Sequence, residues 1–175
     1  MRNSVLFFLL IVIFACENPI PRRPVSHHGQ SFIEESIARN KKINELEKRA
    51  IKYYIAQDSV HNYLESSSGF WYRYIQKNND ATQTPRAEDK VVYRCQISNL
   101  KNEIIYSFND LGNIGYIIDK EDVELGVQAG VKLMKKEEDV VFVFPSFNAF
   151  GLLGDKEEVG MNKPLIYRIQ LIEIN

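Results

Sequence analysis

The chain has 175 residues, and its 22 basic and 23 acidic side chains give a formal net charge of −1. This length is enough for a hydrophobic core without disulfide staples, because a domain of about 150 residues buries roughly 70 % of the surface that its unfolded chain exposes. The charges are balanced and no stretch of the sequence forms a basic stripe, so nucleic acid is excluded as an expected partner.

Residues 1–15 have the pattern of a signal peptide and are not interpreted as part of the fold. Arg2 supplies a positive charge, and an unbroken apolar segment runs from Val5 to Ala15. The segment is shorter than the about 20 residues of a membrane-spanning helix, but it suits the apolar core of a signal peptide. An ordinary secretory peptide, in which Cys16 has no role, is the alternative.

The sequence Ile13-Phe14-Ala15-Cys16 resembles a bacterial lipobox, although Phe14 is bulkier than the usual occupant of its position. We therefore expect lipid attachment at Cys16. The protein would then be anchored in the bacterial cell envelope and face the periplasm. The sequence leaves open whether the inner or the outer membrane holds the anchor. Each buried methylene of the lipid contributes about 0.8 kcal/mol to membrane binding. Cys95 then has no partner for a disulfide. Removal of residues 1–15 leaves 21 basic and 23 acidic side chains, a net charge of −2.

Residues 16–30 are expected to form a tether that lifts the folded part off the membrane. The stretch 17–30 holds three of the six prolines and has no hydrophobic periodicity, which is typical of an extended, semi-rigid linker. His27 and His28 are adjacent, but two such histidines in a tether usually contact only water. We expect neither a metal ion nor a cofactor.

Residues 31–65 are expected to form an N-terminal helical segment. Ser31 and Glu34 have the spacing of a capping box, with Ser31 as the N-cap, and the predicted helix runs to about Gln57. Its apolar stripe consists of Ile43, Leu46, Ala50 and Tyr54. Such a stripe can form a homodimer through this helix or pack against its own domain, and the sequence leaves both open.

Residues 66–175 are expected to form the main domain, of the α+β class. Val91, Tyr93, Cys95 and Ile97 alternate with more polar residues, which predicts a half-buried strand. The other predicted strands are Phe70–Ile75, Ile104–Phe108, Val140–Phe144 and Leu165–Ile174, with a loop over 110–115. Asp119 is the candidate N-cap of a helix over 120–134, whose Val123, Val127, Val131 and Met134 share one face. This order predicts an antiparallel sheet wrapped on one short helix.

Three motifs follow one another in the second half of the chain. Gly130-Val131-x-x-Met134 ends the predicted helix, Pro145-x-x-x-Ala149-Phe150-Gly151 follows a buried strand, and Asn162-x-x-Leu165-x-Tyr167 opens the last one. In this order they resemble the FK-binding-protein (FKBP) family of peptidyl-prolyl isomerases. The resemblance covers roughly the last hundred residues. It implies an FKBP-like domain that acts on proline-containing segments of other proteins.

The same resemblance implies the positions of the site. The family's catalytic positions correspond to Tyr106, Val123, Glu124, Val127, Phe150 and Tyr167, and its further substrate-binding positions to Cys95, Ser107, Ile114 and Val159. Four of these depart from the family: Ser107 replaces an aspartate, Val127 a tryptophan, and Phe150 and Cys95 each a tyrosine. These departures keep open a non-catalytic chaperone or scaffold with the same fold.

Within the family, the N-terminal half looks most like the gliding-motility lipoprotein isomerases. The features that carry this similarity are the lipobox, Arg22-Arg23-Pro24, the long charged helix and the strand beginning Gly69-Phe70-Trp71-Tyr72. The similarity implies a membrane-anchored isomerase that assists the folding of exported envelope proteins.

Overall fold

The computed structural model describes the backbone of residues 27–175 and the side chains of residues 32–175. The chain divides into two compact units, Met1–Ile37 and Ala38–Asn175. The predicted signal peptide, the lipid site at Cys16 and most of the predicted tether lie outside the described residues. In the part that is described, no helix is both long and apolar enough to cross a membrane. The predicted domain boundary at residue 66 stays a prediction.

Helix α2 (His27–Gln57) begins before the capping box that was expected to start it. Ser31 lies inside the helix, so its prediction as N-cap is wrong, and residues 27–30 are helical and not part of a tether. A serine followed three residues later by a glutamate also fits a helix interior. Gly29 is a poor helix former, but no proline lies between His27 and Gln30, and the helix extends upstream of the motif.

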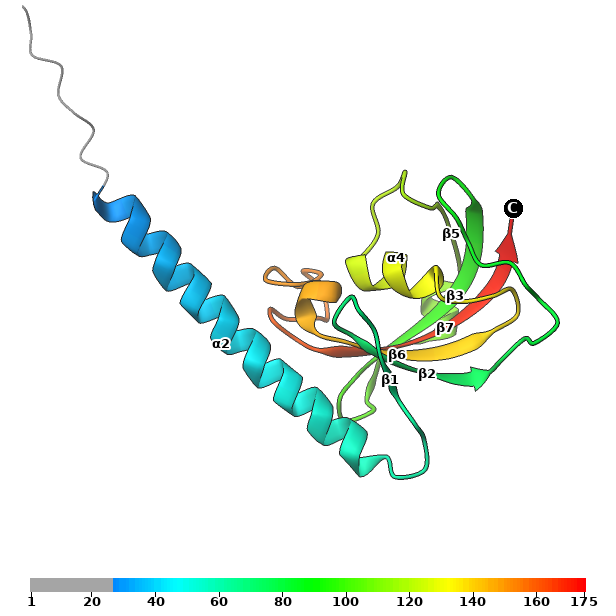
Figure 1. The fold of residues 1–175 in the computed structure, drawn as a ribbon, viewed down its shortest axis with the longest axis horizontal. Coiled ribbons are helices and arrows are strands. Elements are labelled where there is room, and N and C mark those ends of the chain that lie inside the picture. The colour runs from blue at the N-terminus through cyan, green and yellow to red at the C-terminus, as the bar shows by residue number, and fades with distance from the viewer. Residues whose placement is uncertain (1–26) are drawn as a thin grey trace, which may run out of the picture. The chain divides into compact units, whose positions relative to one another are not determined.

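One antiparallel sheet forms the centre of the second unit, in the strand order β1-β2-β6-β7-β3-β4 (Figure 1). The long strand β3 pairs along its length with β7, and its other edge pairs with β5 and β4. The strands are β1 (Leu64–Glu65), β2 (Trp71–Gln76), β3 (Lys90–Asn99), β4 (Ile104–Tyr106), β5 (Asn113–Ile117), β6 (Asp139–Phe144) and β7 (Leu165–Ile174). The predicted α+β class, with an antiparallel sheet and a long N-terminal helix, is confirmed.

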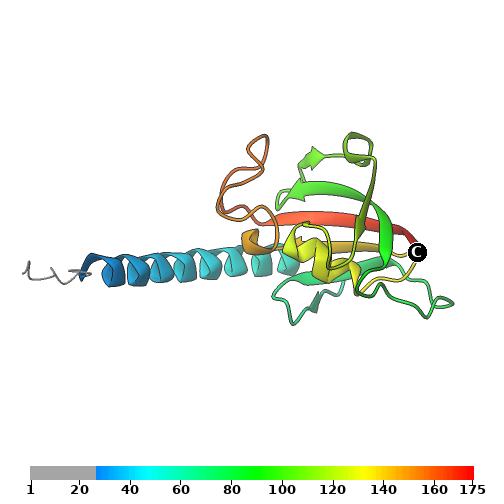
Figure 2. The same ribbon diagram turned by 90° about the horizontal axis from the view of Figure 1, so that it is seen from above.

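Three short helices connect the strands: α3 (Phe108–Leu111), α4 (Leu125–Val131) and the 3-10 helix η2 (Ser146–Asn148). Helix α4 lies against one face of the curved sheet (Figures 1 and 2). The predicted helix over 120–134 was too long. Asp119 has a positive φ of 62° and does not cap a helix, and the helix starts only after Glu124.

The loop predicted over 110–115 is also wrong in part. Residues 113–117 form β5 because the free edge of β3 offers them backbone partners, and Gly115 lies opposite Val92. Strand β4 is likewise shorter than predicted, since it ends at Tyr106 and Ser107 is the N-cap of α3.

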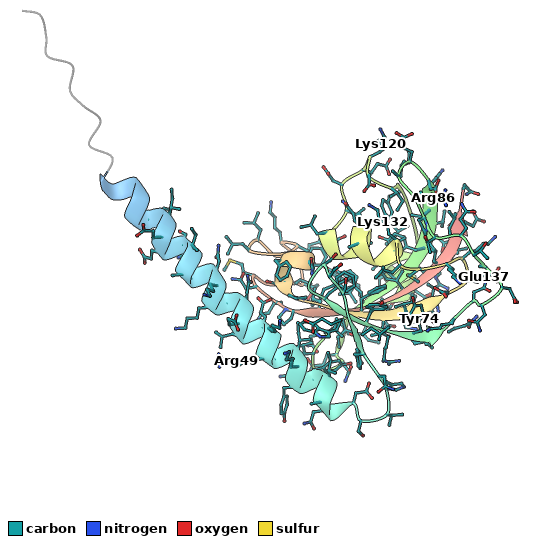
Figure 3. The ribbon with its side chains drawn as sticks, in the orientation of Figure 1. Arg49, Tyr74, Arg86, Lys120, Lys132 and Glu137 are labelled. Atoms are coloured by element: carbon teal, nitrogen blue, oxygen red, sulfur yellow. The ribbon has the colours of Figure 1, made fainter. Side chains whose placement is uncertain are left out.

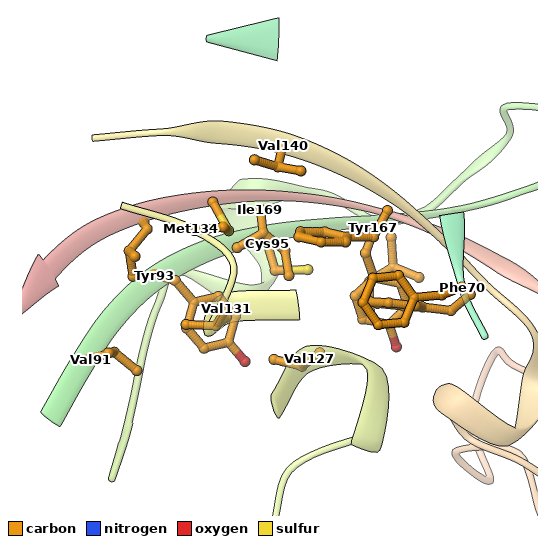
Figure 4. Close-up of a cluster of buried hydrophobic side chains, with 14 of the residues drawn as sticks. Phe70, Val91, Tyr93, Cys95, Val127, Val131, Met134, Val140, Tyr167 and Ile169 are labelled. Atoms are coloured by element: carbon orange, nitrogen blue, oxygen red, sulfur yellow. The ribbon is translucent and has the colours of Figure 1, made fainter. Parts of the chain in front are cut away.

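Strand β6 is buried on both faces, and its alternate side chains enter two separate clusters. Phe142 and Phe144 belong to the larger cluster, in which Val127 of α4 faces Cys95 of β3 (Figure 4). Val143 belongs to the smaller cluster on the opposite face. The neighbouring strands β6, β7 and β3 all contribute buried side chains to the larger cluster, which therefore lies on the central part of the sheet.

The second part of α2 covers the smaller cluster. Ile51 is fully buried there against Trp71, so this part of the helix packs against its own domain. The predicted stripe was offset, because Leu46 is 49 % exposed whereas Glu47 and Ile51 are buried. The polar face of the helix and the segments around α4 carry charged side chains such as Arg49, Lys120 and Lys132 (Figure 3).

Candidate functional site

A cavity of about 640 Å³ opens on the α4 side of the sheet, within the size range of small-ligand sites. Its floor is formed by β3 and β7, where Ile97 pairs with Tyr167. Val123 and Glu124, which precede α4, form one wall together with Tyr106 from β4. Phe150 and the chain that follows it close the remaining side. We call residues 146–163 the rim segment.

The floor is built from the buried face of neighbouring strands. Tyr93, Cys95 and Ile97 alternate along β3, and Tyr167 projects from β7 toward the same side of the sheet as Cys95 (Figure 4). The ring of Tyr167 packs edge-to-face against Phe144 with 5.1 Å between their centroids. Burial raises the pKa of both the Cys95 thiol and the Tyr167 hydroxyl. Both groups are therefore neutral at physiological pH, and the floor is uncharged.

The rim segment starts where Pro145 ends strand β6, as the sequence predicted. Its first residue is held by Glu47 of α2: the backbone N–H of Ser146 donates to Glu47 Oε2 at 2.7 Å, and Ser146 Oγ donates to Oε1 at 2.7 Å. Glu47 is 6 % and Ser146 3 % exposed. Gly151 N–H also donates to the carbonyl of Ser146 at 2.8 Å. Phe150, which lies between these points, is thus fixed by a contact from a distant helix.

A close approach of α4 to η2 brings the wall and the rim together. A Cβ atom at Gly126 would lie 2.6 Å from the carbonyl oxygen of Asn148 and 2.7 Å from the ring of Phe144. Only glycine fits at this position without displacing backbone. Asn148 is itself fixed, because its Nδ2 donates to the carbonyl of Ser68 at 3.1 Å.

Asp155 connects the far part of the rim segment to the sheet. Tyr106 Oη donates to Asp155 Oδ2 at 2.5 Å, while the backbone N–H groups of Glu157 and Val159 each donate to Oδ1 at 2.8 Å. Desolvation acts to raise the pKa of Asp155, but these hydrogen bonds outweigh it and the pKa is lowered. The same bond raises the pKa of Tyr106 to about 12. At neutral pH a carboxylate therefore accepts from a neutral phenol.

The charges around the cavity all have one sign. Its lining includes four acidic residues, Asp122, Glu124, Asp155 and Glu157, and no basic one. No serine, threonine, lysine or histidine lines it either, and the Cys95 thiol is protonated. The lining therefore offers no nucleophile that is activated for covalent catalysis. It is suited to holding an apolar ring, such as a proline side chain, between aromatic walls.

Seven of the ten predicted site residues line this cavity: Cys95, Tyr106, Ile114, Val123, Glu124, Phe150 and Tyr167. Their contact with substrate stays a prediction. Three others lie elsewhere. Ser107 is the N-cap of α3 and forms a capping box with Asp110. Val127 is 1 % exposed and packs in the core beneath the cavity, and Val159 is buried beside another surface hollow.

Six lining residues were missed in the sequence: Tyr93, Ile97, Leu111, Asp122, Asp155 and Glu157. The alternation along β3 was a usable signal for Tyr93 and Ile97, because both share the face of Cys95. Asp155 offered no such signal, since its partner Tyr106 lies 49 residues away in the sequence. Among the described residues, no group of three His, Cys, Asp or Glu side chains is placed to hold a metal ion.

Comparison with known proteins gives one family and several solved structures. The sequence model of the FKBP-type peptidyl-prolyl cis-trans isomerases matches residues 81–172. The structure is similar to that of FkpA from Escherichia coli, with a TM-score of 0.62 and 18 % identity over 100 % of this chain and 83 % of FkpA. A peptidyl-prolyl cis-trans isomerase from Pseudomonas syringae pv. tomato has a TM-score of 0.59 and 19 % identity over 73 % of this chain and 92 % of its own. At these identities the likeness is one of fold. No curated protein matches the sequence.

Proposed function

The chain belongs to the FKBP-type peptidyl-prolyl cis-trans isomerase family, and on this premise we propose that it isomerises X-Pro bonds of exported proteins while anchored to a membrane through Cys16. The observation that supports the place of catalysis is the cavity enclosed by Tyr106, Phe150 and Tyr167. It lies inside the segment that matches the family.

Prolyl isomerisation needs neither a nucleophile nor a proton transfer, so its chemistry fits a cavity with aromatic and aliphatic walls. Rotation about a peptide bond has a barrier of about 18–20 kcal/mol, because resonance makes the bond partly double. A site that binds the twisted amide more tightly than the planar one lowers this barrier, and each 1.36 kcal/mol of such preference accelerates the reaction about tenfold. Aromatic walls at Tyr106 and Phe150 hold the proline ring, and the neutral floor keeps water away from the amide.

The activity is tested with a peptide that contains one X-Pro bond, followed after a solvent jump that enriches the cis form. Uncatalysed relaxation takes tens to hundreds of seconds. We expect the protein at micromolar concentration to shorten this relaxation, and we expect the Phe150→Ala variant to shorten it less. Relaxation at the uncatalysed rate with the wild-type chain would contradict the proposed function.

The anchor is supported by the lipobox-like sequence before Cys16. In cells, the Cys16→Ser variant should move from the membrane fraction to the soluble fraction and remain folded. Ser4→Ala, which changes the signal peptide but keeps the cysteine, is the control and should stay with the membrane. Retention of Cys16→Ser on membranes after a high-salt wash would show that the anchor lies elsewhere.

We further propose that the clients are exported envelope proteins, among them components of gliding-motility machinery. This rests on the similarity of the N-terminal half to the lipoprotein isomerases of that system. Cells that lack the protein should spread more slowly on a surface and should accumulate misfolded envelope proteins. The wild-type chain should restore spreading, whereas Phe150→Ala should restore it poorly.

A homodimer through α2 belongs to the same proposal. In the first unit, Phe32, Ile33 and Ile37 are each more than half exposed. Ile33 and Ile37 are four residues apart and share one face of the helix, which suits an interface with another copy. Sedimentation of the unlipidated chain should give a dimer, and Ile33→Ser with Ile37→Ser should give a monomer of unchanged helical content.

A chaperone role beside isomerisation has one observation in its favour. The rim segment exposes Leu152, Leu153 and Met161, at 61 %, 71 % and 63 %. Phe150 and Asp155 on either side of the two leucines line the cavity, so these side chains lie next to it in the chain. Leu152→Ser with Leu153→Ser should weaken the suppression of client aggregation and leave the relaxation of a short proline peptide unchanged.

A further inference from the structure

Two buried side-chain oxygens among the described residues have no hydrogen-bond partner, the hydroxyls of Tyr116 and Tyr167. Buried hydroxyls are nearly always paired, because an unpaired one has given up its bonds to water without replacement. A phenylalanine at either position would avoid this cost and fill almost the same volume. The presence of a hydroxyl therefore needs a reason, and the two tyrosines differ in what surrounds them.

Tyr116 lies on β5 in the core, where its ring meets that of Tyr93 edge-to-face with 6.0 Å between centroids. It does not line the cavity. Tyr167 is 1 % exposed and lines the cavity floor. Its hydroxyl oxygen is covered in the free protein, so a peptide carbonyl reaches it by displacing the side chains that cover it.

Two carboxylates that line the cavity act on the Tyr167 hydroxyl. Burial raises its pKa most, and the charges of Glu124 and Asp155 raise it further. Both carboxylates line the same cavity. The hydroxyl consequently keeps its proton and can act only as a neutral donor or acceptor. Glu124 and Asp155 make no hydrogen bond with it, so its proton is available.

We propose that the Tyr167 hydroxyl donates a hydrogen bond to a backbone carbonyl oxygen of the proline-containing segment bound in the cavity. A peptide carbonyl is the acceptor that every such segment carries, whatever its side chains. Two other phenols belong to the lining: Tyr106 already donates to Asp155, and the ring of Tyr93 packs against Tyr116. Phe150 and Val123 offer aromatic and aliphatic contact without a side-chain donor. The bond turns an unpaired polar group of the free protein into a paired one in the complex.

This assignment rests on the proposed function, because it requires a proline-containing segment in the cavity. It goes beyond that function in giving Tyr167 a polar role in addition to its ring. The bond is made to the bound peptide before and during rotation, so its loss should raise KM and leave kcat within about twofold.

The test compares Tyr167→Phe with Tyr116→Phe in the full chain. Both variants remove one unpaired buried hydroxyl and keep the ring, so both should melt at the wild-type temperature or slightly above it. With a tetrapeptide containing one X-Pro bond, Tyr167→Phe should lower kcat/KM about tenfold, mainly through KM. Tyr116→Phe should leave kcat/KM unchanged. Wild-type kinetics for Tyr167→Phe, or an equal loss in both variants, would overturn the assignment.

Peptide binding, measured by titration calorimetry on the same three proteins, separates this assignment from the isomerase function. If the wild type bound the tetrapeptide without accelerating its relaxation, the result would contradict the isomerase function but not the hydrogen bond. Binding weakened about tenfold in Tyr167→Phe would then still support the hydrogen bond. Equal binding by wild type and Tyr167→Phe, or no binding by the wild type, would refute it.

Discussion

The floor and the rim of the cavity are held in place by different forces. The floor consists of paired strands whose inward side chains, such as Cys95 and Tyr167, are buried in the largest apolar cluster of the domain. The rim segment has irregular backbone, with positive φ at Gly151 and Gly154, and exposes Leu152 and Leu153. Burial of apolar area stabilises the floor, whereas a few polar bonds fix the position of the rim.

Two carboxylates provide those bonds, one at the start of the rim segment and one near its middle. Glu47 holds Ser146 at the start, and Asp155 binds Tyr106 near the middle. Changes in the floor should therefore affect stability and activity together. Changes in the rim should affect activity more than stability. Each of the following variants tests this difference.

Tyr167→Ala should have the largest effect. It removes a fully buried ring that packs against Phe144, and truncation of a buried aromatic side chain costs about 3–5 kcal/mol of the free energy of unfolding. Urea denaturation measures the loss, and isomerase activity should fall as well. Tyr167→Phe, which keeps the ring, is the control for the free energy of unfolding. A variant that stayed within about 1 kcal/mol of the wild type would mean that the floor is not held by burial.

Glu47→Ala should come next. Without the carboxylate, the N–H and Oγ of Ser146 are left buried and unpaired, at a cost of about 1–3 kcal/mol. The rim then loses its first anchor, so kcat/KM for a proline peptide should fall although no residue of the cavity was changed. Glu45→Ala, two residues away on the exposed face of α2, should change neither quantity. If the two variants had the same stability and the same kcat/KM, Glu47 would not be an anchor of the rim segment.

The difference between the floor and the rim also explains how much of the site the sequence could predict. The floor was predictable because burial leaves a local pattern. Alternation along Val91–Ile97 gave the buried face of β3, and the bounds of Leu165–Ile174 agree with those of β7. The run Val140–Phe144 and its end at Pro145 gave β6.

The rim and its anchors left no such pattern. Glu47 and Ser146 are 99 residues apart, and Tyr106 and Asp155 are 49 apart. No periodicity relates residues at such distances, and a charged residue on a helix normally indicates its solvent face. The length of helix α4 was overestimated for a related reason. Val123 continues the helical spacing of apolar residues, although the chain from Asp119 to Glu124 is not helical.

Phe150→Ala should have a smaller effect and one confined to activity. The side chain is only partly buried at the rim, and the strand's own core residues Phe142 and Phe144 remain in place. We expect an isomerase rate about tenfold lower, equivalent to about 1.4 kcal/mol in the transition state, with little change in melting temperature. A large fall in melting temperature with the rate intact would instead place Phe150 among the core residues.

The smallest expected effect is a pH dependence of the second rim anchor. The pKa of Asp155 is lowered in the folded chain, so its contribution to stability is present above the unfolded value of about 3.9 and is lost as the pH falls toward the folded value. The pKa of Tyr106 is raised to about 12. Its contribution is therefore present below about pH 10 and is lost as the pH rises from there toward the folded value. Between about pH 5 and 9 the anchor should not change.

The backbone N–H of Val159 reports this anchor, because it donates to the Asp155 carboxylate. Its NMR chemical shift and its hydrogen-exchange rate should change below about pH 4, while amides of the floor stay as they are. In Asp155→Asn the acid transition should disappear, since an amide does not titrate. Tyr106→Phe should keep it and lose only the alkaline one. An acid transition of Val159 that survived in Asp155→Asn would assign it to another carboxylate, and the rim would then have an anchor other than the two described.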